Sequence, residues 1–134
     1  LSAVSKPARK DILDEMTKED LVEWIRSHHF FMKPKKSDVL YLRWNRQSAQ
    51  VVAEMEKENR ALDHLDFGER DRLAKQFNES KDPNERLRLI EKIEPYDKAM
   101  RDHLSRYEAI NRKQKRVDAL YEQVEVERRK EQQA

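Results

Sequence analysis

Apolar side chains recur every three or four positions along most of this chain, which is the spacing of one face of an α-helix. In the C-terminal third the recurring residues are Ile93, Tyr96, Met100, Tyr107, Ile110, Val117, Tyr121 and Val124. An earlier run with similar spacing consists of Tyr41, Trp44, Val51, Met55, Leu62 and Leu65. The two runs predict long helices over residues 38–66 and 83–127.

Start and stop signals predict a shorter helix near the N-terminus. Thr17 is followed by Lys18, Glu19 and Asp20, so two carboxylates fall in a first helical turn, where the helix dipole favours negative charge. Pro34 lacks an amide hydrogen and ends such a helix before it. These signals predict a helix over residues 17–29.

Three further residues divide the second half of the chain. Gly68 predicts a hinge or a cap before a short helix over 69–79. Asp82 and Pro83 form a strong start signal, because aspartate caps a helix and proline suits its first position. Pro95 removes one backbone hydrogen bond, so it is expected to kink the last helix or to split off its first turns.

The composition favours an all-α protein. Of the 134 residues 42% are charged and 37% hydrophobic, so the chain cannot bury a large globular core, and its single glycine cannot supply the turns of a strand-rich domain. The expected architecture is an elongated helical bundle with a long C-terminal coiled-coil-like helix. Its parts are a flexible N-terminal arm over 1–16, a short bundle over 17–94, and a long oligomerisation helix over 95–134 with a frayed tail after Val126.

The two long helices are expected to differ in length. At 1.5 Å per residue the earlier one spans roughly 43 Å and the last one roughly 70 Å, so the shorter helix cannot cover the longer. The uncovered part would need a partner: a second copy of the chain, with a dimer favoured, or a helix of another protein. The seam predicted to bind it consists of Met100, Tyr107, Ile110, Val117, Tyr121 and Val124. The alternative is that the helix folds back over a compact bundle and only its end protrudes.

Nucleic acid is the alternative partner. The sequence around Pro34 is basic and is followed by aromatic residues, which suits phosphate contacts and base stacking. A short helix, a tight turn and a longer helix would form a helix-turn-helix-like unit. The nucleic-acid-binding residues predicted at this basic corner are Lys33, Lys35, Lys36, Arg43 and Arg46. Against this interpretation, the chain carries a net charge of only +2, and Trp44 and Tyr41 also suit a helical core.

The chain lacks the motifs of common catalytic and metal sites. It has no cysteine, and its single glycine cannot form a phosphate-binding loop. His28 and His29 are adjacent, so on a helix their side chains point about 100° apart and do not suit one zinc ion. No apolar run approaches the roughly 20 residues of a membrane span. We therefore expect a non-catalytic protein without cofactor, metal or membrane partner, located inside a cell or a virus particle.

Overall fold

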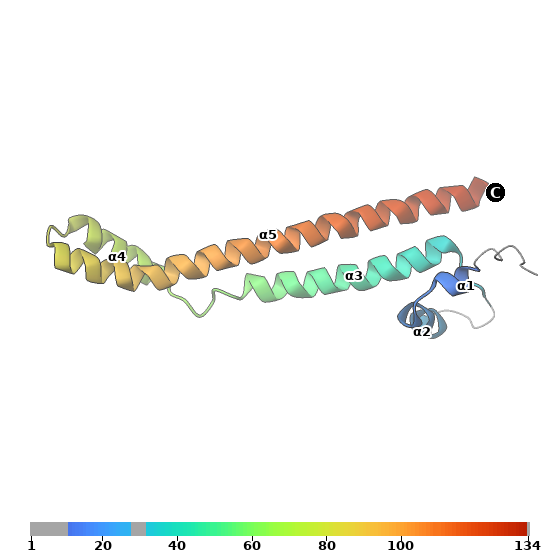
Figure 1. Cartoon of the computed structure of the whole chain (residues 1–134), viewed down its shortest axis with the longest axis horizontal. Helices are drawn as coiled ribbons and strands as arrows, with labels where there is room; N and C mark the ends of the chain where they lie inside the picture. Colours follow the sequence, from blue (N-terminus) through green and yellow to red (C-terminus); the bar gives the residue numbers. More distant parts are fainter. Residues whose placement is uncertain (1–10, 28–31, 134) are drawn as a thin grey trace, which may run out of the picture. The chain divides into compact units, whose positions relative to one another are not determined.

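The structure is a computed structural model, and it describes residues 11–27 and 32–133. This part of the chain is all-α and contains no strand. Its helices are α1 (Ile12–Glu15), α2 (Lys18–Ser27), α3 (Lys36–Asn59), α4 (Phe67–Glu79) and α5 (Pro83–Gln133), shown in Figure 1. The prediction of an all-α protein with a long C-terminal helix is confirmed.

The chain forms two compact units that each combine distant parts of the sequence. The first unit contains the chain up to Gln50 together with the segment from Gln114 onward, and the second unit contains Val51–Lys113. Both α3 and α5 therefore contribute to both units. These units cut across the predicted boundary at residue 95, because the end of α5 belongs with the N-terminal helices.

The core of the first unit begins within the segment predicted to be a flexible arm. Met16 is buried together with Trp24, Val39 and Leu42. It follows α1, whose N-cap Asp11 accepts a hydrogen bond from the Leu13 N–H at 3.1 Å. The prediction of an arm reaching residue 16 is therefore wrong for residues 11–16, since a capped turn brings Met16 into the core; residues 1–10 lie outside the described residues.

Reciprocal capping starts α2 where the sequence predicts it. The Thr17 N–H donates to Asp20 Oδ2 and the Asp20 N–H donates to Thr17 Oγ1, each at 3.1 Å. The helix ends at Ser27, and Trp24 Nε1 then donates to the Met32 carbonyl at 2.9 Å. His28 and His29 lie outside the described residues.

In the first unit, α3 runs antiparallel to the end of α5. The Glu131 carboxylate accepts hydrogen bonds from the Ser37 N–H at 3.1 Å and the Ser37 hydroxyl at 2.6 Å. Further along, the rings of Trp44 and Tyr121 lie 4.8 Å apart. The prediction of a frayed tail is wrong, because α5 continues to Gln133 and Glu131 satisfies a backbone donor in the first turn of α3.

In the second unit, α4 and the first turns of α5 form a helical hairpin (Figure 1). Asp66 caps α4 by accepting hydrogen bonds from the N–H groups of Gly68 at 2.9 Å and Glu69 at 3.3 Å. A side chain at Gly68 would place its Cβ 2.9 Å from Asp66 Oδ1, so glycine leaves room for this cap. The predicted cap at Gly68 therefore lies within the first turn of α4, and α3 ends at Asn59 instead of continuing to 66.

The hairpin is closed by an arginine and by buried leucines. The Arg86 guanidinium donates to the carbonyls of Phe77 at 3.0 Å and Ser80 at 2.9 Å, and it lies 3.9 Å above the Phe77 ring. Leu73 of α4 and Leu89 of α5 are both buried.

The last helix begins as predicted and is not divided. The Asn84 N–H donates to the Asp82 side chain at 3.0 Å, and the first residue of α5 is Pro83. Pro95 lies inside a single helix. The expectation that Pro95 splits off the first turns is wrong, since one missing hydrogen bond does not end a helix that packs against α4.

Candidate functional site

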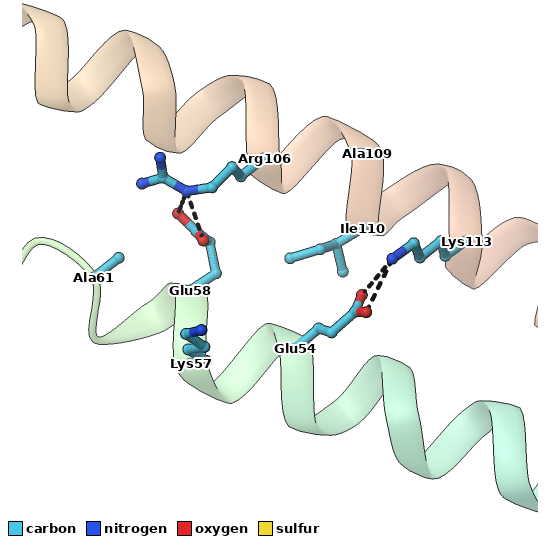
Figure 2. Close-up of a pocket in the computed structure, with 8 residues that line it drawn as sticks. All are labelled: Glu54, Lys57, Glu58, Ala61, Arg106, Ala109, Ile110 and Lys113. Carbon is cyan, nitrogen blue, oxygen red and sulfur yellow. Dashed lines mark hydrogen bonds and ion pairs between the residues drawn. The ribbon is translucent and has the colours of Figure 1, made fainter.

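A groove of about 520 Å³ lies in the second unit between the end of α3 and the middle of α5. Figure 2 shows the residues that line it. From α3 and the turn after it they are Glu54, Lys57, Glu58 and Ala61, and from α5 they are Arg106, Ala109, Ile110 and Lys113.

Two ion pairs border this groove. Arg106 Nε donates to both Glu58 oxygens at 3.0 Å, and Lys113 Nζ donates to the Glu54 oxygens at 2.9 and 3.0 Å. His103 Nδ1 lies 2.8 Å from Glu58 Oε1. The two carboxylates thus hold α3 against α5, and Figure 2 shows Ile110 between the two pairs.

The electrostatics of Glu58 favour its ionised form. Hydrogen bonds from Arg106 are the largest influence on its pKa; partial burial opposes them, His103 adds to them, and the resulting pKa lies below the ordinary value. A carboxylate with these donors and a lowered pKa is a weak proton acceptor near neutral pH. Glu58 therefore does not suit the role of a general base.

Replacing Glu58 by glutamine is expected to lower the urea midpoint of unfolding, whereas replacing Glu54 by glutamine is expected to leave it nearly unchanged. The reason is that only 8% of the Glu58 side chain is exposed, against 42% for Glu54, and exposed ion pairs contribute little to stability. Circular dichroism during urea unfolding measures both. Equal midpoints for the two variants would contradict the larger contribution of Glu58 to stability.

The predicted oligomerisation seam is divided between the interior and the surface. Ile110, Val117 and Val124 are buried, with exposed fractions of 6%, 3% and 0%. Met100 and Tyr121 are each 36% exposed, and Tyr107 is intermediate. The expectation that the stripe from Tyr107 to Val124 is only half covered is therefore wrong for Ile110, Val117 and Val124, whereas Tyr121 stays partly exposed.

The chain itself covers the aliphatic side chains of this stripe, because α3 lies along α5 in each unit. As a binding surface for a partner, the predicted seam stays a prediction. A partner could reach its three aliphatic side chains only if the helices of the chain separated.

The basic corner is engaged in contacts within the first unit. Arg43 Nε and Arg46 donate to the two oxygens of Asp20 at 2.9 and 2.8 Å, and Arg46 also donates to Glu23 at 2.8 Å. Arg43 additionally donates to the Glu15 carbonyl at 3.0 Å. The two arginines thus join α2 to α3.

Two of the three lysines predicted at this corner also lie near carboxylates. Lys33 pairs with Asp11, and Lys36 Nζ lies 3.8 Å from Glu127. The backbone N–H of Lys35 donates to the Asp38 side chain at 2.8 Å, which caps α3. A phosphate backbone would therefore compete with acidic residues for most of this predicted site.

Asp20 is fully buried and ionised. Burial is the largest influence on its pKa and would raise it, but hydrogen bonds from Arg46, Arg43 and the Thr17 N–H together outweigh burial, and the pKa lies below the ordinary 3.8. Removing one member of a buried ion pair leaves the other charge uncompensated. Arg43 and Arg46 therefore have a structural role within the chain, whereas the sequence predicts them only as nucleic-acid-binding residues.

Sequence reasoning missed a set of exposed apolar residues on α5, beside the groove that Ile90 and Asp97 help to form with α4. Leu87, Ile90 and Leu104 are 59%, 47% and 58% exposed. Their signal is present in the sequence, because positions 87, 90, 94, 97, 101 and 104 follow the alternating three and four residue spacing of a helix face. Charged residues occupy the middle positions, so the set does not stand out as an apolar run.

Comparisons with known proteins give no assignment: no protein-family model, curated protein or solved structure matches the chain. Within residues 11–27 and 32–133, no cluster of three or more histidine, aspartate or glutamate side chains is arranged to hold a metal ion. In the same part of the chain, none of the helices is long and apolar enough to cross a membrane.

Proposed function

We propose that the chain is a non-catalytic helical assembly protein that associates with a second copy through α5. The observation that carries this proposal is the exposure of Leu87, Ile90 and Leu104 on one helix, each with about half or more of its surface in water. Apolar side chains that recur on one helix face are typical of surfaces that bind another helix.

The polar groups of the chain support a non-catalytic role. The carboxylates of Asp20 and Glu58 are held by arginines, and no buried side-chain nitrogen or oxygen among the described residues lacks a hydrogen-bond partner. Catalytic groups, in contrast, commonly have strained or incompletely satisfied surroundings that shift the pKa toward the working pH.

The proposal keeps the predicted partner but moves the contact on α5. The aliphatic part of the predicted seam packs within the chain, whereas Leu87, Ile90 and Leu104 are exposed on the same helix. Met100, also of the predicted seam, is 36% exposed and lies one turn before Leu104. Leu87 and Leu104 thus stay exposed while α5 packs against α3 and α4, and Ile90 lies at the edge of a groove that α5 forms with α4.

Replacing Leu87 and Leu104 together by serine is expected to weaken self-association at least tenfold. Burial of each leucine side chain contributes about 1.5–3 kcal/mol, and a dimer would lose four of them. Sedimentation equilibrium measures the effect. Val52→Ser is the matched control, because Val52 is 51% exposed but lies on α3. A double variant that associates as strongly as this control would contradict the proposal.

A further inference from the structure

One face of α5 in the second unit has a regular order of side-chain chemistry. We call this face the outer stripe, and its residues are Leu87, Ile90, Glu94, Asp97, Arg101 and Leu104. All belong to the uninterrupted helix α5, and the spacing of alternately three and four residues places them along one side of it. At 1.5 Å per residue the stripe is about 25 Å long.

The outer stripe is apolar, acidic, basic and again apolar from its N-terminal to its C-terminal end. Leu87 and Ile90 form the first apolar end, Glu94, Asp97 and Arg101 are the charged residues, and Leu104 is the second apolar end. Reversing the direction of the helix exchanges the positions of Glu94 and Arg101, keeps Asp97 near the middle and leaves apolar residues at both ends. The stripe is therefore complementary to a reversed copy of itself.

A parallel copy does not have this complementarity. Two parallel stripes in register would place Glu94 opposite Glu94 and Arg101 opposite Arg101. Like charges that face each other across a helix pair are destabilising, whereas opposite charges at flanking positions select the partner and its direction.

We propose that two copies of the chain dock antiparallel through the outer stripe, with Glu94 of each copy paired to Arg101 of the other. This inference rests on the proposed self-association through α5 and specifies its geometry. The two-fold axis passes between residues 97 and 98, midway between Glu94 and Arg101.

The same register brings the apolar ends together. With the axis between residues 97 and 98, Leu104 of one copy is level with residue 91 of the other, one residue from Ile90 and about one turn from Leu87. Each Leu104 thus lies beside the apolar end of the second copy, and its side chain can pack between those of the facing helix. Both ends of the interface become covered at once.

The ion pair between Glu94 and Arg101 within each copy can be replaced by pairs between the two copies. Glu94 and Arg101 of one chain are paired at 2.6 Å, but their side chains are 57% and 61% exposed, and such a surface pair contributes little by itself. Asp97 lies near the two-fold axis, where it would face its own equivalent. Arg70 Nε lies 3.1 Å from Asp97 and offsets that repulsion within each copy.

Charge-reversal variants test the antiparallel register. Glu94→Arg alone and Arg101→Glu alone are each expected to weaken self-association at least tenfold, because each places two like-charged pairs in the dimer. An equimolar mixture of the two variants is expected to recover the dimer. In that mixed dimer the two introduced side chains, of opposite charge, face each other, and the unchanged Arg101 of one variant faces the unchanged Glu94 of the other. The double variant with both changes in one chain is expected to dimerise like the unmodified protein.

The mixture distinguishes contacts between copies from the pair within one chain. Mixing cannot repair a contact inside either single variant, so recovery in the mixture requires pairing between copies. Lys92→Glu is the matched control: Lys92 is exposed on the other side of α5, and its replacement changes the charge as Arg101→Glu does. This control is expected to associate like the unmodified protein.

Two results overturn the inference in different ways. If either single variant keeps the self-association of the unmodified chain, the antiparallel register is wrong while the proposed function stands. If the unmodified chain remains monomeric up to millimolar concentration, the register and the proposed function both fail. Circular dichroism of each variant confirms that a change in mass is not a loss of helix.

Discussion

Replacing Val124 by aspartate is expected to destabilise the first unit by more than about 4 kcal/mol. The Val124 side chain has no exposed surface, and it lies on the face of α5 that α3 covers. An aspartate there would bury a carboxylate without a partner and would also remove apolar contacts. Because small proteins are stable by only about 5–15 kcal/mol, much of the helix signal should be lost in moderate urea.

Val126→Asp is the matched control for this experiment. Val126 lies two residues further along the same helix and is 40% exposed. Its replacement places the same charge in water and is expected to change stability by about 0.5 kcal/mol. Equal urea midpoints for the two variants would contradict the packing of α5 against α3.

Replacing Asp20 by asparagine is expected to destabilise the first unit by about 3 kcal/mol. The change removes the carboxylate that Arg43 and Arg46 share and leaves two guanidinium groups, each only partly exposed, without their common partner. Urea unfolding followed by circular dichroism measures the loss. Glu19→Gln is the control, because Glu19 is the exposed neighbour in the same first turn. A midpoint for Asp20→Asn that matches the control would contradict the structural role of the network.

The pH dependence of stability tests the same group. The pKa of Asp20 is lower in the folded chain than the ordinary 3.8, so the unfolded chain binds the proton more readily. The stabilisation by Asp20 is therefore complete above pH 3.8 and is lost as the pH falls through the folded-state pKa. Asp20→Asn is expected to flatten this acid loss; an unchanged acid profile would show that Asp20 does not contribute to it.

The starts of the helices could be predicted because their causes are local. Thr17 and Asp20 cap α2 reciprocally, and Asp82 caps the start of α5 just before Pro83. Each cap joins residues within three positions of one another, so the sequence contains the whole interaction. The same kind of signal is present at Asp11, which caps α1, and at Asp14 within it, but α1 has only four residues and is too short to show a helical period of apolar positions.

The pairing of helices could not be predicted, because its causes are distant in sequence. Arg43 reaches Asp20 across 23 residues, and Ser37 reaches Glu131 across 94. The sequence therefore presents the basic corner as free charge and the end of α5 as a tail without a partner. Helical spacing indicates which side chains face inward on α5, but it does not indicate that α3 covers them.

In the candidate site, too, local features could be predicted from the sequence and contacts between distant residues could not. Ile110 is predicted to lie on an apolar seam, and it lies on α5 facing α3 between two ion pairs (Figure 2). The ion pairs themselves, Glu58 with Arg106 and Glu54 with Lys113, join residues 48 and 59 positions apart. Their positions follow from the antiparallel register of α3 and α5, which the sequence alone does not specify.

The central claim is that the chain assembles with itself through α5, and its most direct test is the solution mass of the unmodified protein. Sedimentation equilibrium from micromolar to millimolar concentration is expected to show a rise from the monomer mass of 16.2 kDa toward twice that value. A mass that stays at 16.2 kDa across this whole range would contradict the claim.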